Sequence, residues 1–213
     1  MDEPRAYHHG DLRAALLDAA EAELSETGIE GFALRRVARR AGVSHAAPAH
    51  HFGDVCGLLT ALAERGFARL LALADARQAR VAKDDPRRQL LAYGLAYSDF
   101  SREHRALFRL CFASDRPDFA STSLDAGGRA AFDRLTELVG AVRGVPVGGD
   151  VEAMQDVHAA WAMIHGIADL LASGRLKMLG GLPPKARDGR IAALLDRALP
   201  EGPGRAGQRG SPR

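Results

Sequence analysis

The stretch ARRAGVSHAAPAHHFGD, from Ala38 to Asp54, reads as two short helical segments separated by a tight turn. Gly42 can adopt the positive φ that a sharp turn between helices requires. Val43 can fill the angle between the segments, because it is an apolar side chain placed directly at the bend. We predict one helix over 34–41 and a second over 45–52, which is a helix-turn-helix pattern.

The second helix of this pair is short and carries a proline near its start. Ser44 is a suitable N-cap, which would place Pro48 at the fourth helical position, where the missing N–H is tolerated. A short helix with an outward-facing N-terminus suits insertion into the major groove of DNA.

Charge is distributed unevenly, although the 29 basic and 27 acidic residues nearly cancel. Residues 1–30 contain two arginines and eight acidic residues, a net charge of −6. Residues 31–53 contain four arginines, no acidic residue and three of the eight histidines, a net charge of +4. This basic window is a candidate anion-binding face. A solvated helix face would account for the same charges.

Apolar residues recur at helical spacing along most of the chain, and β-branched residues are sparse, so we predict an all-α fold of about nine helices. The first helix should end at Thr27, before Gly28. Beyond the helix-turn-helix, further helices are expected over 54–83, 86–101, 103–113, 121–142, 151–174 and 185–199. We predict a helix-turn-helix domain over 1–53, a helical domain over 54–199 and a disordered tail rich in Gly, Pro and Arg over 200–213.

Membrane and secreted proteins have sequence features that are missing here. No apolar run approaches the roughly 18 residues of a membrane helix, and the first residues have no apolar signal-peptide core. Cys56 and Cys111 form no CxxC pair and are expected to be buried structural residues. We therefore expect a cytoplasmic protein in a reducing compartment, without membrane partners.

Enzyme and metalloprotein classes are also disfavoured. No GxSxG, P-loop or GxGxxG motif is present, so no catalytic residues and no cofactor are assigned. His158 and His165 lie seven residues apart on one helix face, about 10.5 Å, which is too far for one ion. We predict that the chain is not an enzyme and has no metal site.

The quoted stretch, preceded by GFALRRV over 31–37, resembles the signature of the TetR family of bacterial transcription regulators. The segment over 7–20 (YHHGDLRAALLDAA) is similar to the first helix of one large subgroup, and the segment over 103–112 (EHRALFRLCF) resembles part of its ligand-binding domain. The pattern of that domain also includes a tryptophan, a histidine and a glycine, here Trp161, His165 and Gly166. The resemblance implies a three-helix DNA-binding domain followed by a helical domain for effector binding and dimerisation.

The resemblance also implies which residues meet DNA, and charge adds Arg36 to them. The candidate DNA-binding residues are Arg35, Arg36, Ser44, His45, Ala46, Ala47, Ala49, His50 and His51. Arg35 falls on a base-contacting position, and Ser44 and His51 fall on phosphate-contacting positions. Arg39 and Arg40 are further phosphate neighbours by charge.

Two positions depart from the family pattern. Ala49 stands where the family usually has a tyrosine that packs on the DNA backbone, and Val55 stands where it usually has a lysine. Each change removes a phosphate contact, so weaker non-specific DNA affinity is expected.

Large side chains gather on the helices that resemble the family's effector-binding domain. The candidate ligand-binding residues are Tyr93, Tyr97, Phe100, Phe108, Phe112, Met154, Trp161 and His165. A mainly apolar cavity with a few polar tips suits a small apolar or aromatic effector. Simple filling of a core is the alternative for these residues.

Together these features predict a ligand-responsive transcription regulator. We expect a homodimer that represses from a palindromic double-stranded DNA operator and is released by the effector. The alternative is a helical effector- or partner-binding protein with a weakened DNA-binding head. Similar family members dimerise through their last two long helices, whose apolar residues here include Val157, Ala160, Ile164, Leu171, Ile191, Leu194 and Leu195.

Overall fold

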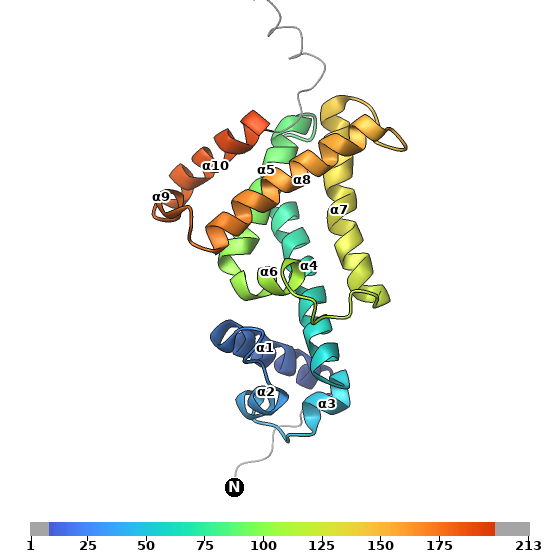
Figure 1. Cartoon of the computed structure of the whole chain (residues 1–213), viewed down its shortest axis with the longest axis vertical. Helices are drawn as coiled ribbons and strands as arrows, with labels where there is room; N and C mark the ends of the chain where they lie inside the picture. Colours follow the sequence, from blue (N-terminus) through green and yellow to red (C-terminus); the bar gives the residue numbers. More distant parts are fainter. Residues whose placement is uncertain (1–8, 199–213) are drawn as a thin grey trace, which may run out of the picture. The chain divides into compact units, whose positions relative to one another are not determined.

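The computed structural model describes residues 9–198, and all regular structure within that range is α-helical (Figure 1). The helices are α1 (His9–Thr27), α2 (Leu34–Ala41), α3 (Ala47–Phe52), α4 (Val55–Gln78), α5 (Pro86–Glu103), α6 (Arg105–Phe112), α7 (Thr122–Arg143), α8 (Val151–Ala172), α9 (Lys177–Gly180) and α10 (Pro184–Ala198). The all-α prediction is confirmed. The one helix that the sequence pattern did not predict is the four-residue α9. The predicted tail over 200–213 lies outside the described residues.

The described chain forms two compact units. Residues up to Phe67, together with Arg105–Gly127, make the first unit; Ala68–His104 and the residues from Gly128 onward make the second. The helices α4 and α7 each begin in the first unit and end in the second.

In the first unit, α1 packs against α2 and α6. Leu16, Ala20 and Leu24 of α1 are almost completely buried, as are Val37 and Ala38 of α2. The three residues of α1 lie at four-residue intervals, which places them on one face of the helix. The spacing that predicted this helix is therefore the spacing that forms the core.

The turn between α2 and α3 follows from Gly42, which has φ 69° and ψ 31°. The Gly42 N–H donates to the Arg39 carbonyl at 3.2 Å, and the Val43 N–H donates to the Ala38 carbonyl at 3.0 Å. These two bonds are the Schellman arrangement, which satisfies the last carbonyls of a helix. The predicted positive φ at this turn is confirmed.

Helix α3 begins later than predicted. Ser44 is not its N-cap: the Ala47 N–H donates to the Ser44 carbonyl at 3.1 Å in a preceding turn, and Ala46 occupies the N-cap position. Pro48 is therefore the second helical residue, where no backbone N–H is needed for an intrahelical bond. The proline favours the later start, since a helix from His45 would have placed it deeper in the helix.

In the second unit, α5 packs against α8 and α10 (Figure 1). The Asp85 side chain caps α5 by accepting from the Arg88 backbone N–H at 3.0 Å. The buried Tyr93 hydroxyl donates to the Ala131 carbonyl at 2.8 Å and so joins α5 to α7.

Helix α4 ends at Gln78 instead of continuing to Lys83 as predicted. The Gln89 side-chain amide, from α5, donates to the carbonyls of Gln78 and Val81 at 3.2 and 3.1 Å. These carbonyls would otherwise lack partners at the helix end. A side chain of the next helix, eight to eleven residues along the chain, thus satisfies the carbonyls at the earlier end.

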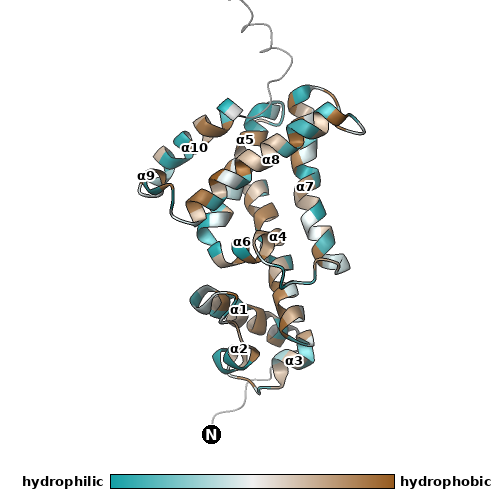
Figure 2. Cartoon of the chain, in the orientation of Figure 1, coloured by the Kyte–Doolittle hydropathy of each residue, from teal (hydrophilic) through white to brown (hydrophobic). Residues whose placement is uncertain are grey.

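Helix α8 is apolar on more than one side. Of the seven apolar residues named in the sequence of the last two long helices, all except Leu194 are buried within the protomer. The large apolar side chains that are exposed on α8 and α10 are Val151, Trp161, Met163, Leu170 and Leu194. In Figure 2, apolar brown residues of α8 alternate with hydrophilic ones along the helix. Despite this composition, none of the helices described is long and apolar enough to cross a membrane.

Candidate functional site

The predicted DNA-contacting residues surround the helix-turn-helix and are mostly exposed. Arg35 on α2, and His45, Ala49 and His50 around α3, are open to solvent. Ser44 and Ala46 are also exposed, whereas Ala47 and His51 are half-buried. The side chains assigned to base edges are thus accessible to a ligand as large as DNA.

Contacts within the first unit hold α3 in place. The Arg13 guanidinium of α1 lies 5.1 Å from the centre of the Phe52 ring at the end of α3, a cation–π arrangement. Asp54 accepts from the Gly57 N–H at 2.8 Å and so caps the start of α4. The rings of His50 and His51 meet edge to face at 5.5 Å. The short helix is therefore fixed at its C-terminal end, and its exposed side chains project from an ordered base.

The four arginines of the basic window have different surroundings. Arg36 and Arg40 both pair with Glu23 of α1, and Arg40 also pairs with Glu26. Arg35 and Arg39 are exposed and form no ion pair with any residue that the structure describes. The +4 of the window is thus partly neutralised by acidic residues from α1.

The two departures from the family pattern also lie beside this face. Ala49 is exposed, so a tyrosine at its place would reach solvent or DNA. Val55, at the first position of α4, is half-buried. Neither side chain can donate a hydrogen bond to a phosphate.

In the second unit, three of the predicted ligand-binding residues lie together. The Tyr97 hydroxyl of α5 is 3.0 Å from His165 Nδ1 of α8. The Trp161 ring lies 6.3 Å from the His165 ring. Trp161 itself is 42% exposed, so the group presents an aromatic surface beside the polar pair of buried Tyr97 and half-buried His165.

Two residues that were not predicted as ligand-binding join this group. Phe132 of α7 meets Trp161 edge to face at 6.1 Å, and His158 lies 6.2 Å from Phe132. Phe132 lies in a helix predicted from its periodicity, and its aromatic ring was the signal that could have identified it. We call Tyr97, Phe132, His158, Trp161 and His165 the aromatic cluster.

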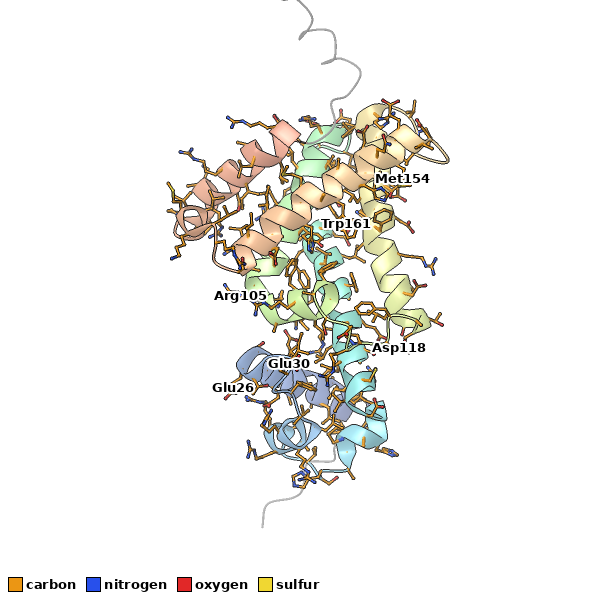
Figure 3. All side chains as sticks on the ribbon, in the orientation of Figure 1. Glu26, Glu30, Arg105, Asp118, Met154 and Trp161 are labelled. Atoms are coloured by element: carbon orange, nitrogen blue, oxygen red, sulfur yellow. The ribbon has the colours of Figure 1, made fainter. Side chains whose placement is uncertain are left out.

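The remaining predicted ligand-binding residues lie elsewhere. Phe108 and Phe112 belong to the first unit, where Phe112 meets Phe67 edge to face at 5.5 Å. Phe100 is fully buried beside the His104 ring. Tyr93 is buried and bonded to α7, and Met154 is half-buried on α8, two turns before Trp161 (Figure 3).

Burial changes the acid–base behaviour of two of these side chains. It lowers the pKa of His165 below its usual 6.5, and nearby Asp169 opposes this effect. Burial raises the pKa of Tyr93, against a smaller opposing effect of Arg134. Both groups are therefore neutral near pH 7, which suits an apolar or uncharged surrounding.

A cavity of about 520 Å³ lies at the end of α7 and the loop that follows it. Its walls are mostly glycine and small apolar side chains, including Gly140, Val145 and Val147, with Thr136 and Glu137 as polar groups. None of the predicted ligand-binding residues lines it.

The cysteines differ from each other. Cys56 is exposed, so the prediction that it is buried was wrong; Cys111 is buried, and its thiol donates to the Ala63 carbonyl at 3.5 Å. The first turn of a helix on the surface leaves Cys56 uncovered. Among residues 9–198, no group of three or more His, Cys, Asp or Glu side chains could hold a metal ion.

Comparisons with known proteins place this geometry in a family. The chain is 31% identical over 185 residues to the HTH-type transcriptional regulator BetI of Burkholderia cenocepacia, covering 75% of this chain and 93% of that protein. It is 42% identical over 87 residues to BetI of Paraburkholderia phytofirmans, but this match spans only 44% of that regulator's length. A solved structure of a protein of unknown function from Rhodococcus sp. RHA1 is 35% identical, with a TM-score of 0.73, and the match covers 92% of this chain and 98% of the other.

Two family models also match. Residues 16–62 match "Bacterial regulatory proteins, tetR family", and residues 90–198 match "Tetracyclin repressor-like, C-terminal domain". The named relatives are transcriptional regulators and not enzymes, in agreement with the prediction of a non-enzymatic class. The narrower subgroup defined by Trp161, His165 and Gly166 stays a prediction. With a helix-turn-helix of this geometry, and with both family models and a near full-length relative in agreement, the chain belongs to the TetR family of bacterial transcriptional regulators.

Proposed function

We propose that this protein is a repressor that binds a palindromic operator as a homodimer and releases it when a small apolar or aromatic effector binds. The observation that carries the proposal is the exposed face of Arg35, His45 and His50 on an ordered helix-turn-helix. The protein is proposed to act in the cytoplasm, because its proposed partner is DNA and its described part has no membrane-spanning helix.

The proposed base contacts follow from the side chains available. Arg35 can donate two hydrogen bonds to one guanine, and His45 and His50 can bond to other base edges. Ala46 and Ala49 offer methyl groups that suit contact with thymine methyls. We expect few hydrogen bonds to bases per half-site, so specific binding should depend on two heads acting together.

The effector is proposed to bind at the aromatic cluster. Its rings offer apolar surface, and the Tyr97–His165 pair offers polar atoms that could orient a ligand. Release of DNA requires the effector to prefer the DNA-incompetent conformation, since equal affinity for both conformations would shift nothing.

Dimerisation is proposed to use the exposed side of α8 and α10. Met163, Leu170 and Leu194 leave apolar surface there that no described part of the chain covers. A twofold pair would also match a palindromic operator. Light scattering should report a dimer mass, and Leu170→Glu should shift it toward the monomer.

DNA binding is tested with fluorescently labelled DNA from upstream of the protein's own gene. The wild type should bind specifically, with an affinity that falls steeply with salt. Arg35→Ala should reduce discrimination between this DNA and a scrambled sequence; Arg88→Ala, an exposed arginine of the second unit, is the matched control. No binding at any salt concentration would instead support the alternative of a weakened head, which Ala49 and Val55 favour.

Effector binding has a built-in probe, because Trp161 is the only tryptophan of the sequence. An effector at the aromatic cluster should change Trp161 fluorescence and weaken DNA binding over the same concentration range. A change in DNA binding without any change in fluorescence would contradict this location and direct attention to the cavity beside Gly140.

A further inference from the structure

The four arginines of α2 lie on two adjacent faces of one helix. Arg35 and Arg39 are four residues apart, and so are Arg36 and Arg40, which places each pair on its own face. Only the second pair meets acidic residues of α1. The two faces therefore have different electrostatic surroundings.

The contacts of the second face centre on Glu23. Its side chain is only 2% exposed, and its two carboxylate oxygens accept from Arg36 and Arg40. A buried carboxylate is stable as an ion only when it is paired and hydrogen-bonded. Moving either guanidinium away to reach a phosphate would remove part of that compensation.

Arg40 has a second partner in Glu26, whose side chain is 66% exposed. Because this pair is open to solvent, it adds little to the stability of the folded protein. It nevertheless keeps a negative charge beside Arg40, which would oppose the approach of a phosphate to this face.

The first face has no such partner. Arg35 and Arg39 are exposed, and within residues 9–198 no carboxylate pairs with either of them. Both guanidinium groups can therefore reach a phosphate without first breaking an ion pair. Family resemblance points to Arg35 only, and charge alone does not distinguish Arg39 from Arg36 and Arg40. The ion pairs with α1 make that distinction.

We propose that the two faces of α2 have different roles. Arg39 contacts phosphate beside Arg35. Arg36 and Arg40 instead anchor α2 to α1, with Glu23 as the positioning residue. This inference rests on the proposed DNA-binding function. The protein then has fewer phosphate contacts per head than its four arginines suggest. It also corrects the expectation from charge alone that Arg36 and Arg40 neighbour the phosphates.

The experiment measures how DNA affinity depends on salt for Arg39→Gln and Arg40→Gln in the full chain. The slope of log K against log salt is negative, and each lost phosphate contact reduces its steepness by about 0.9 per bound DNA-binding domain. Arg39→Gln should make the slope less steep by this amount and leave the urea unfolding midpoint unchanged. Arg40→Gln should leave the slope unchanged.

Arg36→Gln provides the test of the anchoring role. It should lower the unfolding midpoint, and adding Glu23→Gln should restore part of the loss, because the buried charge that has lost one of its two partners is then removed. The slope of the double variant should equal that of the wild type. If Arg36→Gln does not fold alone, the double variant and Arg40→Gln still measure the slope.

Two results would overturn the inference. One is an unchanged salt dependence for Arg39→Gln; the other is a less steep salt dependence after Arg36 or Arg40 substitution in a stably folded protein. A wild type that does not bind DNA would be a different failure, that of the proposed function, because no slope could then be measured for any variant.

Discussion

Replacement of Gly94 by alanine tests the packing at the junction of α5, α8 and α10. A Cβ added at Gly94 would lie 2.6 Å from Leu195 Cδ1 and 3.4 Å from Ile164 Cγ1. Carbon atoms in contact normally lie about 3.5–4.0 Å apart, so the first distance is an overlap of roughly 1 Å. Leu195 and Ile164 are buried, so the Leu195 methyl group would have to shift within a packed core.

Two effects of opposite sign set the size of the change. Overpacking of a core destabilises by about 1–3 kcal/mol. Alanine in place of glycine inside a helix stabilises by about 1 kcal/mol. Gly94→Ala should therefore lower the free energy of unfolding by up to about 2 kcal/mol.

Gly189→Ala on α10 is the matched control, because a Cβ there meets no atom within 4 Å. It should raise the free energy of unfolding by up to about 1 kcal/mol. The propensity gain is common to both variants, so their difference of about 1–3 kcal/mol measures the packing effect alone.

The assay is urea unfolding followed by far-ultraviolet circular dichroism, with all variants at one protein concentration because dimerisation would shift the midpoint. If Gly94→Ala were as stable as Gly189→Ala, the close approach of α10 to α5 at this glycine would be refuted.

Three further predictions concern single side chains or backbone positions. Gly42→Ala should destabilise the first unit by about 1 kcal/mol through backbone strain alone, because φ is 69° and no atom lies within 4 Å of the added Cβ; an unchanged melting temperature would contradict this. Iodoacetamide followed by mass spectrometry should label Cys56 in the native protein and Cys111 only after unfolding, because Cys111 is buried with a pKa raised to about 12; equal labelling of the native protein would refute the burial. Burial lowers the pKa of His165 in the folded state, so its contribution to stability is present above about pH 6.5 and is lost as pH falls from there toward the folded pKa. Urea midpoints should therefore fall less between about pH 7.5 and pH 5.5 for His165→Gln than for the wild type, and parallel falls would exclude this origin.

The helix-turn-helix and most helix ends could be predicted because their causes are local. The predicted helix over 34–41 matches α2 at both ends, since Gly42 supplies the left-handed conformation within the same segment. The error at the start of α3 also has a local cause, the choice of Ser44 over Ala46 as N-cap. The early end of α4 is different, because the Gln89 amide that satisfies its carbonyls comes from another helix.

The candidate site was predictable only in part. From the local sequence, Arg35 and residues of α3 were expected to contact DNA, and Arg35, Ala49 and His50 are exposed on the first unit. The local sequence could not group Phe132 with Trp161, because one residue comes from α7 and the other from α8. Helical periodicity also could not tell which side of α8 faces the core, since apolar residues occur on more than one side.

By itself, the sequence determined the helical fold class, the turn at Gly42 and the family, because periodicity, backbone preference and a contiguous motif all act over a few residues. Only the tertiary structure decided which charges of the basic window are available. Arg36 and Arg40 are paired with Glu23, more than ten residues away along the chain, whereas Arg35 and Arg39 are exposed. An ion pair between helices depends on how those helices pack, and a sum of charges along a segment does not contain that information.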